Sequence, residues 1–296
     1  AGLLITMGTL GDRIGRRKLL LIGAGAFGVA SVLAALSTSA DMLIAMRALL
    51  GIAGATLAPS TLSLIRNMFH DAHERQFAIG IWMASFSIGG VIGPLVGGVM
   101  LQFFWWGSVF LVAVPVMAAL LILGPSLLPE YRDPNASSID AASVLLSLGA
   151  VLALVYGVKQ IAANNLSWPL VLIVGAGLVC GHIFLRRQRS LAYPLLDMAL
   201  FRQRAFSAAI AAYGLSCMAM FGVYLFITQY LQLVLALTPL QAGLATLPWA
   251  IAFMVGSLLA PGLARHLRRS VGLAWGLGTA AAGFIALTAM TETAGV

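Results

Sequence analysis

Residues 8–18 read Gly-Thr-Leu-Gly-Asp-Arg-Ile-Gly-Arg-Arg-Lys, and this short polar stretch separates two apolar runs. It places four bases and one acid, Asp12, among three glycines. The chain around it is 61% hydrophobic and only 9% charged, with a mean hydropathy of +1.00. A soluble domain carries about a quarter charged residues, so a soluble enzyme is excluded. The composition predicts an all-α, polytopic membrane protein.

The membrane-spanning helices follow from the apolar runs. Each span needs about 20 predominantly apolar residues. The runs predict one partial span at 1–9 and nine full spans, at 19–38, 42–65, 77–102, 107–128, 141–161, 168–185, 207–230, 240–263 and 271–290. Because the chain starts at Ala1, inside an apolar run, we expect a fragment of a longer protein.

The basic residues reveal the topology. Of the 17 Lys and Arg residues, all except Arg47 and Lys159 lie in every second loop, and the intervening loops have none. Cytoplasmic loops are enriched in Lys and Arg, so the loop at 10–18 is predicted to be cytoplasmic. The net charge of +8 therefore reflects membrane topology. A nucleic-acid partner is not expected, because it would need a basic stripe on a soluble surface.

The sequence at 8–18 is more specific than that of an ordinary basic loop. A positive-inside loop explains the bases, but it does not explain an acid among them or glycines at fixed offsets. The stretch resembles the major facilitator superfamily signature between its second and third helices, G-x-L-a-D-r-x-G-r-k/r. The resemblance implies the major facilitator fold and a charge relay at a cytoplasmic gate. Its residues here are Gly8, Asp12, Arg13, Gly15, Arg16 and Arg17.

A second motif surrounds Arg47, which lies within a predicted span. A charge at a helix centre costs roughly 2.5–3.5 kcal/mol, and it usually faces a polar cavity or a partner. The run Leu43-x-x-x-Arg47-x-x-Leu50-Gly51 is similar to the superfamily's proton-coupling motif l-x-x-x-R-x-x-q-G, with Leu50 in place of Gln. The alternative is a structural arginine hydrogen-bonded to neighbouring carbonyls.

A third motif is rich in glycine. Residues 89–98 resemble g-x-x-x-G-P-x-x-G-G, the antiporter motif of superfamily drug exporters, through Gly89, Gly93, Pro94, Gly97 and Gly98. Glycines 89, 93 and 97 line one helix face, and Gly90 and Gly98 flank Pro94 on the next. We therefore expect a flat groove on which another helix packs. A generic packing face is the alternative for the glycines alone. The resemblance indicates an exporter.

The second half resembles the fourteen-helix drug:H+ antiporters, which include quaternary-ammonium and methyl viologen exporters. Two extra spans follow the sixth helix, and the segment 230–248 is similar to the ninth-to-tenth-helix region. The chain would then cover roughly helices 2–11 of 14. The expected domains are an N-terminal six-helix bundle lacking helix 1 at 1–128, two central helices with linkers at 129–206, and the start of a truncated C-terminal bundle at 207–296.

The acids bear on proton coupling, which requires a titratable group inside the membrane. All nine Asp and Glu residues lie in loops or at span ends. We therefore expect the coupling acid in the missing first helix, or in helices 12–14. Some dication exporters of this group carry an acid in helix 10, where this chain has Phe253, which argues against a dication preference.

The remaining candidates are aromatic or polar side chains. Tyr213, Tyr224, Gln229 and Trp249 are candidates to line a cavity and stack on an aromatic cation, and helix packing is the alternative for each. His70 and His73 flank Asp71 in a sequence typical of a helix cap rather than of a metal site. Neither a metal nor a cofactor is expected.

Together these features predict a multidrug efflux transporter, not an enzyme. It would export lipophilic cations across the inner membrane by proton antiport, as a monomeric multi-pass protein whose partners are the lipid bilayer, its substrates and protons. Two alternatives remain: an exporter of a metabolite such as an amino acid or lipid-like molecule, and an inactive truncated transporter.

Overall fold

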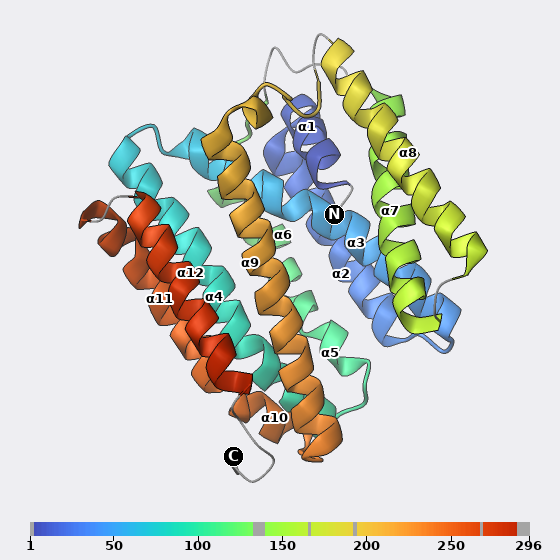
Figure 1. The fold of residues 1–296 in the computed structure, drawn as a ribbon, viewed down its shortest axis with the longest axis vertical. Coiled ribbons are helices and arrows are strands. Elements are labelled where there is room, and N and C mark those ends of the chain that lie inside the picture. The colour runs from blue at the N-terminus through green and yellow to red at the C-terminus, as the bar shows by residue number, and fades with distance from the viewer. Residues whose placement is uncertain (1–2, 133–139, 165–166, 192–193, 267–268, 289–296) are drawn as a thin grey trace. The chain divides into compact units, whose positions relative to one another are not determined.

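The computed structural model of the chain describes residues 3–132, 140–164, 167–191, 194–266 and 269–288. Within these ranges every regular element is a helix (Figure 1). This confirms the predicted all-α fold. Three charged residues, Asp133, Arg268 and Glu292, lie outside the described residues.

The described part of the chain contains twelve α-helices. They are α1 (Leu4–Ile14), α2 (Arg16–Ala35), α3 (Ala40–Met68), α4 (Ala72–Phe103), α5 (Ser108–Leu111), α6 (Ala113–Leu127), α7 (Ala141–Asn164), α8 (Trp168–Ser190), α9 (Arg204–Gln229), α10 (Pro239–Ala245), α11 (Leu247–His266) and α12 (Arg269–Thr288). A 3-10 turn at Leu200–Arg202 precedes α9, and a π turn at Tyr230–Val234 extends it.

Seven helices in the described part are long and apolar enough to cross a membrane, and an eighth span forms if a bent pair is counted as one. The bent pair joins α10 to the start of α11 at an angle of 40°. The ninth predicted span falls on α12, whose apolar stretch Ala274–Ala286 is shorter than a full crossing. Seven of the nine predicted full spans therefore coincide with a helix long enough to cross a membrane, and an eighth coincides with the bent pair.

Side-chain caps start several of these helices. The Ser39 hydroxyl accepts the Met42 N–H at 3.2 Å, and one Asp71 carboxylate oxygen accepts the N–H groups of His73 and Glu74 at 2.9 and 3.0 Å. These backbone donors lower the pKa of Asp71, because they stabilise the ionised carboxylate. The predicted cap at the start of α4 is confirmed.

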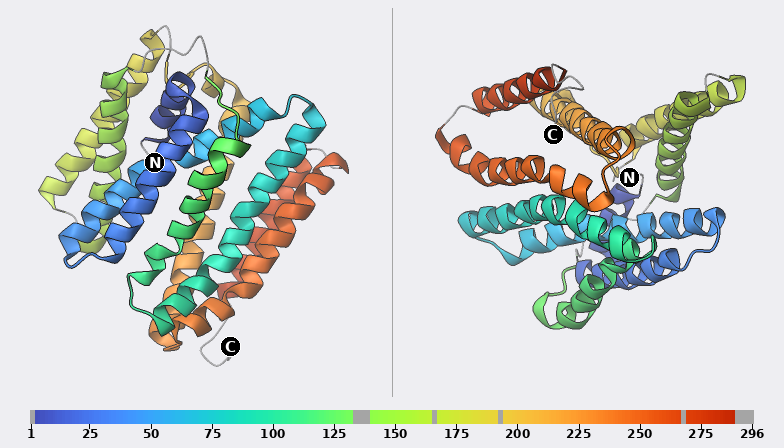
Figure 2. Two further views of the ribbon diagram at one scale, coloured as in Figure 1. Left: turned by 180° about the vertical axis from the view of Figure 1, so that it is seen from behind. Right: turned by 90° about the horizontal axis from the view of Figure 1, so that it is seen from below.

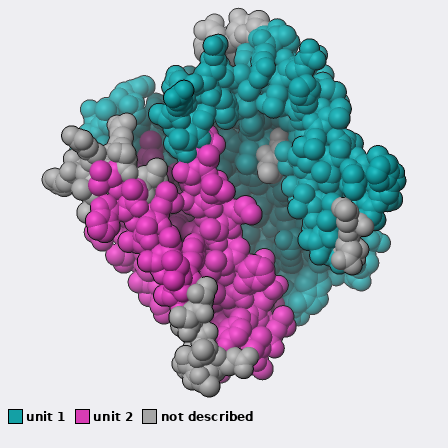
Figure 3. Space-filling model, in the orientation of Figure 1, with its two compact units in different colours: residues 1–78, 104–209 teal, residues 79–103, 210–296 magenta. Residues whose placement is uncertain are grey.

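The chain divides into two compact units, coloured separately in Figure 3. The first contains residues 1–78 and 104–209, and the second contains residues 79–103 and 210–296. The long helix α4 contributes its first turns to the first unit and the rest to the second. This grouping differs from the three consecutive segments expected from the sequence.

In the first unit α2 is the most buried helix. It packs against α3 and α6, and Figure 2 shows α2 and α3 side by side. Leu20 and Ala24 of α2 are 1% and 0% exposed. Gly23 faces Thr56 of α3 so closely that a methyl group on Gly23 would overlap its side chain. Such close approach through small residues is how membrane helices associate without a hydrophobic driving force.

Helices α7 and α8 form a hairpin in the same unit (Figure 1). A Cβ on Gly177 of α8 would lie 3.1 Å from the Leu154 backbone nitrogen of α7. The second unit contains the remainder of α4 together with α10, α11, α12 and most of α9.

Candidate functional site

A single residue, Gly15, connects α1 to α2. Its φ of +113° lies in the region that L side chains rarely adopt, so glycine is required here for conformational reasons. The turn brings the last turn of α1 against the first turn of α2. Both turns belong to the predicted gate motif.

Asp12 and Arg16 form the ion pair of this turn. The Arg16 Nε donates to the Asp12 carboxylate at 2.8 Å, and Arg16 is only 7% exposed. A Cβ on Gly11 would lie 3.0 Å from the Arg16 Cδ, so the glycine leaves room for the arginine. Among the described residues, no group pairs with the buried Nη1 of Arg16. A buried charge held by one carboxylate is sensitive to removal of its partner.

Arg17 points to a different helix. Its Nη1 donates to the carbonyl oxygens of Pro125 and Leu128 at 3.1 and 3.0 Å, at the C-terminal end of α6. Those carbonyls have no partner within the helix and carry the negative end of the helix dipole. Arg17 therefore ties the start of α2 to the end of α6.

Glu130 completes this connection from the opposite direction. Its two carboxylate oxygens accept the backbone N–H groups of Arg17 and Lys18 at 3.1 and 3.2 Å, and the Arg17 Nε lies 3.6 Å away. The Arg16 N–H donates to the Tyr131 carbonyl at 2.9 Å. A carboxylate on the first N–H groups of a helix is favoured by the helix dipole. We call Gly15, Arg17 and Glu130 the α2–α6 clamp.

The gate residues predicted from the sequence therefore divide into groups. Asp12 and Arg16 pair with each other, and Gly15 and Arg17 belong to the clamp. Gly8 faces Pro59 of α3, and Arg13 is exposed, without an ion pair inside the described ranges.

The sequence analysis missed Glu130. The available signal was its position directly after an apolar span, in a loop predicted on the same membrane face as the bases at 13–18.

Arg47 lies in the second turn of α3 and is exposed. Within the described part of the chain it has no carboxylate partner and no carbonyl acceptor. One turn further on, a methyl group added to Gly51 would meet no described atom within 4 Å. Both the proton-coupling role of Arg47 and the alternative of a structural arginine stay predictions.

The antiporter motif makes its close contact through Gly98. A Cβ on Gly98 would lie 2.9 Å from both the Leu240 Cα and the Pro239 carbonyl oxygen of α10. In the reverse direction, a Cβ on Gly243 would lie 2.8 Å from the Pro94 carbonyl oxygen. Two glycines thus allow the backbones of α4 and α10 to touch.

The contact with α10 uses one of the two faces of the expected groove, formed by Pro94 and Gly98. A Cβ added to Gly89, Gly93 or Gly97 would have no described atom within 4 Å. Helix packing against this second face stays a prediction. Backbone contact needs a glycine only at the point of closest approach, which in the described chain is Gly98.

The α10 segment is held rigidly for this contact. Thr238 and Gln241 form a reciprocal capping box, with bonds of 2.9 and 3.3 Å. Ala242 and Thr246 are 2% and 5% exposed. A capping box satisfies two backbone donors at the start of a helix, so it stabilises the first turn of α10, which contacts Gly98.

Three aromatic rings stack in the second unit. The Tyr224 ring of α9 lies 4.8 Å from the Trp249 ring of α11, and the Phe253 ring lies 6.0 Å from Trp249, inclined by 10°. The structure therefore brings together two of the four predicted cavity residues and adds Phe253. Tyr213 is 74% exposed, and Gln229 is also exposed.

These long apolar helices define a multi-pass membrane protein, and the comparison with known families agrees. The chain belongs to the Major Facilitator Superfamily, whose family model matches residues 1–296. This confirms the predicted family and fold.

Three of the relatives to which the chain is similar are drug efflux or drug-resistance proteins. It is 48% identical to the multidrug efflux pump LfrA of Mycolicibacterium smegmatis, over 96% of this chain and 56% of LfrA. It is 34% identical to the methyl viologen resistance protein SmvA of Salmonella typhimurium, over 99% of this chain and 59% of SmvA. It is 33% identical to the multidrug resistance protein Stp of Mycobacterium tuberculosis, over 93% and 51%. The chain thus spans between half and three-fifths of the length of these relatives.

Proposed function

We propose that this chain is part of a multidrug efflux transporter that exports lipophilic cations by proton antiport. It works as a monomer in the inner membrane, with its basic loops in the cytoplasm. The observation that carries the proposal is the backbone contact between the antiporter motif and α10, through Gly98 and Gly243. Similarity to LfrA, SmvA and Stp supports the same activity.

The contact between α4 and α10 supports an exchange mechanism. Packed backbones resist gradual deformation, so an interface of this kind favours a small number of discrete arrangements. Alternating access requires such discrete states, because the substrate site must open to one side at a time. Gly98 and Gly243 would stabilise one of them.

The aromatic stack supports a cationic, aromatic substrate. Tyr224, Trp249 and Phe253 present parallel or tilted ring faces, and Phe253 is 40% exposed. A cation over such a face gains about 0.5–2 kcal/mol. Stacked rings also bind flat apolar molecules, so we assign this stack to substrate binding.

The α2–α6 clamp and the Asp12–Arg16 pair support the gate. They join α1, α2 and α6 at the end of the first unit that carries the basic loop. We assign to them the stabilisation of the closed cytoplasmic gate. Arg47 would act in proton coupling through a partner supplied by the rest of the protein. None of the described carboxylates lies in the middle of a span. We therefore expect the rest of the protein to supply the coupling acid as well.

The test uses everted membrane vesicles that contain the complete transporter. Respiration acidifies the vesicle interior, ethidium is then added, and both ethidium uptake and the internal pH are recorded. Proton antiport predicts that ethidium uptake is accompanied by proton release and stops when the pH gradient is collapsed. Ethidium uptake without proton exchange would contradict antiport. Exchange of protons for an amino acid, with ethidium inert, would favour the metabolite exporter.

Two tryptophan variants test the substrate site in the same vesicles. Trp249→Leu removes the central ring of the stack, and we expect the ethidium concentration for half-maximal uptake to rise about 2- to 30-fold. Trp275→Leu is the matched control, because Trp275 is 68% exposed on α12 and lies outside the stack. Equal effects of the two variants would contradict the assignment.

A further inference from the structure

A cavity lies at the end of α8, in the segment that leads to α9. Its volume is about 700 Å³, within the usual range of ligand pockets. The lining residues are Gln188, Arg189, Leu191, Pro194, Asp197, Met198, Ala199, Phe201 and Arg202. All of them belong to the first unit, and the gate, the antiporter motif and the aromatic stack do not contribute to it.

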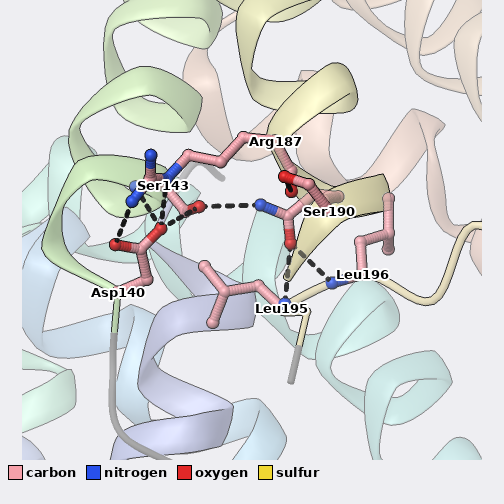
Figure 4. Close-up of polar contacts among 7 residues, drawn as sticks. Asp140, Ser143, Arg187, Ser190, Leu195 and Leu196 are labelled. Atoms are coloured by element: carbon pink, nitrogen blue, oxygen red, sulfur yellow. Dashed lines mark hydrogen bonds and ion pairs between the residues drawn. The ribbon is translucent and has the colours of Figure 1, made fainter. Parts of the chain in front are cut away.

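One wall of the cavity is fixed by Gln188, which is 2% exposed. Its side-chain oxygen accepts the N–H groups of Leu195 and Leu196 at 2.7 and 3.3 Å, and its side-chain nitrogen donates to the Ser143 hydroxyl at 2.8 Å (Figure 4). The segment after α8 is thereby bonded to the α7–α8 hairpin. A buried, satisfied amide of this kind specifies one backbone path.

The hairpin end of this network is also fixed. The Ser143 hydroxyl donates to the Asp140 carboxylate at 2.6 Å, and Arg187 donates to both oxygens of Asp140 at 2.6 and 3.0 Å (Figure 4). The guanidinium group of Arg187 is therefore paired with the Asp140 carboxylate. The structure around the cavity is prearranged, which reduces the ordering cost of binding a ligand.

The two arginines that line the cavity, Arg189 and Arg202, differ from Arg187 in their ion pairing. In the part of the chain that the structure describes, neither Arg189 nor Arg202 has an ion pair with a carboxylate. The acid of the lining, Asp197, accepts the N–H of Ala199 at 2.8 Å. Two guanidinium groups without an ion pair therefore accompany one carboxylate, and the lining carries net positive charge.

We propose that this cavity binds the phosphate headgroup of an anionic phospholipid. Guanidinium groups match phosphate geometry, and basic pockets at the ends of membrane helices bind anionic headgroups. The cavity lies at the last residues of the α8 span, which is headgroup depth. Leu191, Met198 and Phe201 add an apolar lining that a free phosphate would not need but that the glycerol and first acyl carbons of a lipid would contact.

The proposal is independent of the transported substrate, and lipid binding to the complete transporter tests it. The purified transporter is reconstituted in nanodiscs of phosphatidylcholine, with phosphatidylglycerol as the titrated probe, and bound lipid is counted by native mass spectrometry. We expect Arg189→Gln and Arg202→Gln each to weaken phosphatidylglycerol binding about fivefold, as one basic group near a membrane surface contributes. Asp197→Asn keeps the acceptor for Ala199 and removes the opposing charge, so it should strengthen binding.

The matched control is the double variant Arg186→Gln/Arg204→Gln. It removes the same charge from the same loop but from residues outside the lining. Equal losses in this control and in Arg189→Gln/Arg202→Gln would mean diffuse attraction to a basic loop and would overturn the site. The same titration with glycerol 3-phosphate separates the sources: binding as tight as that of the lipid would overturn the lipid assignment. All variants should retain the unfolding temperature of the parent in phosphatidylcholine alone.

Discussion

Gly15 lies directly against Glu130, so that a methyl group on Gly15 would approach the Glu130 Oε1 to 2.6 Å. The same carboxylate accepts the first backbone N–H groups of α2. Glycine at this position therefore serves two purposes, since it allows a positive φ and it admits a carboxylate to the start of the helix. A motif glycine that looks like a simple turn residue is in fact part of a contact between α2 and the end of α6.

The first prediction concerns Gly15→Ala. The substitution places a side chain at φ +113° and displaces the Glu130 carboxylate, so we expect a loss of about 1–3 kcal/mol in the free energy of unfolding. Thermal unfolding of the purified chain in detergent measures it. Gly175→Ala is the control, because a methyl group there would meet no described atom within 4 Å. An equal loss in the two variants would show that the clamp contributes nothing.

The second prediction separates charge from hydrogen bonding at Glu130. Glu130→Gln retains one oxygen acceptor for the α2 backbone and loses the pairing with Arg17, whereas Glu130→Ala loses both. Transport in vesicles should therefore fall in the order parent, Glu130→Gln, Glu130→Ala, with similar amounts of protein in the membrane. Arg17→Lys keeps the charge but not the planar geometry that reaches Pro125 and Leu128, so it should also transport more slowly. Parental transport rates in all three variants would show that the α2–α6 clamp does not contribute to the cytoplasmic gate.

Features that depend on neighbouring residues in the chain could be predicted from the sequence, whereas contacts between distant residues could not. The spans were predicted because hydropathy is a local property, and seven of the nine predicted full spans fall on a helix long enough to cross a membrane. Glu130 was missed because its partner in α2 lies 113 residues away, and a local pattern does not encode that pairing. For the same reason, the glycine pattern of α4 predicted a packing groove but did not indicate that Pro94 and Gly98 are the residues that contact α10. Glycine spacing marks where a helix is able to approach, and the position of α10 decides where it does.

The third prediction uses the Pro94–Gly98 face. Gly98→Ala puts a methyl group 2.9 Å from the α10 backbone, which has no flexible side chain to move away. We expect overpacking to cost about 1–3 kcal/mol and to slow the exchange of ethidium for protons. Gly93→Ala changes the same motif at a position with open space. It should unfold at the parental temperature, and a loss as large as that of Gly98→Ala would contradict the proposed contact.

The fourth prediction concerns Asp140 and pH. The pKa of Asp140 lies well below its usual range because Arg187, and then Ser143, donate hydrogen bonds to the carboxylate. A carboxyl group with a pKa lowered by folding stabilises the folded state above its unfolded pKa of about 4, and this contribution is lost as the pH falls toward the folded pKa. The Asp140–Arg187 pair should therefore stabilise the α7–α8 hairpin evenly between pH 5 and 8. The difference in unfolding temperature between the parent and Asp140→Asn should be constant in that range and shrink below about pH 4. Asp41→Asn is the control, because Asp41 has no ion pair among the described residues, and its effect at neutral pH should be much smaller. A parent–Asp140→Asn difference that already disappears between pH 5 and 7 would contradict a strongly paired carboxylate and would remove the fixed wall on which the lipid site depends.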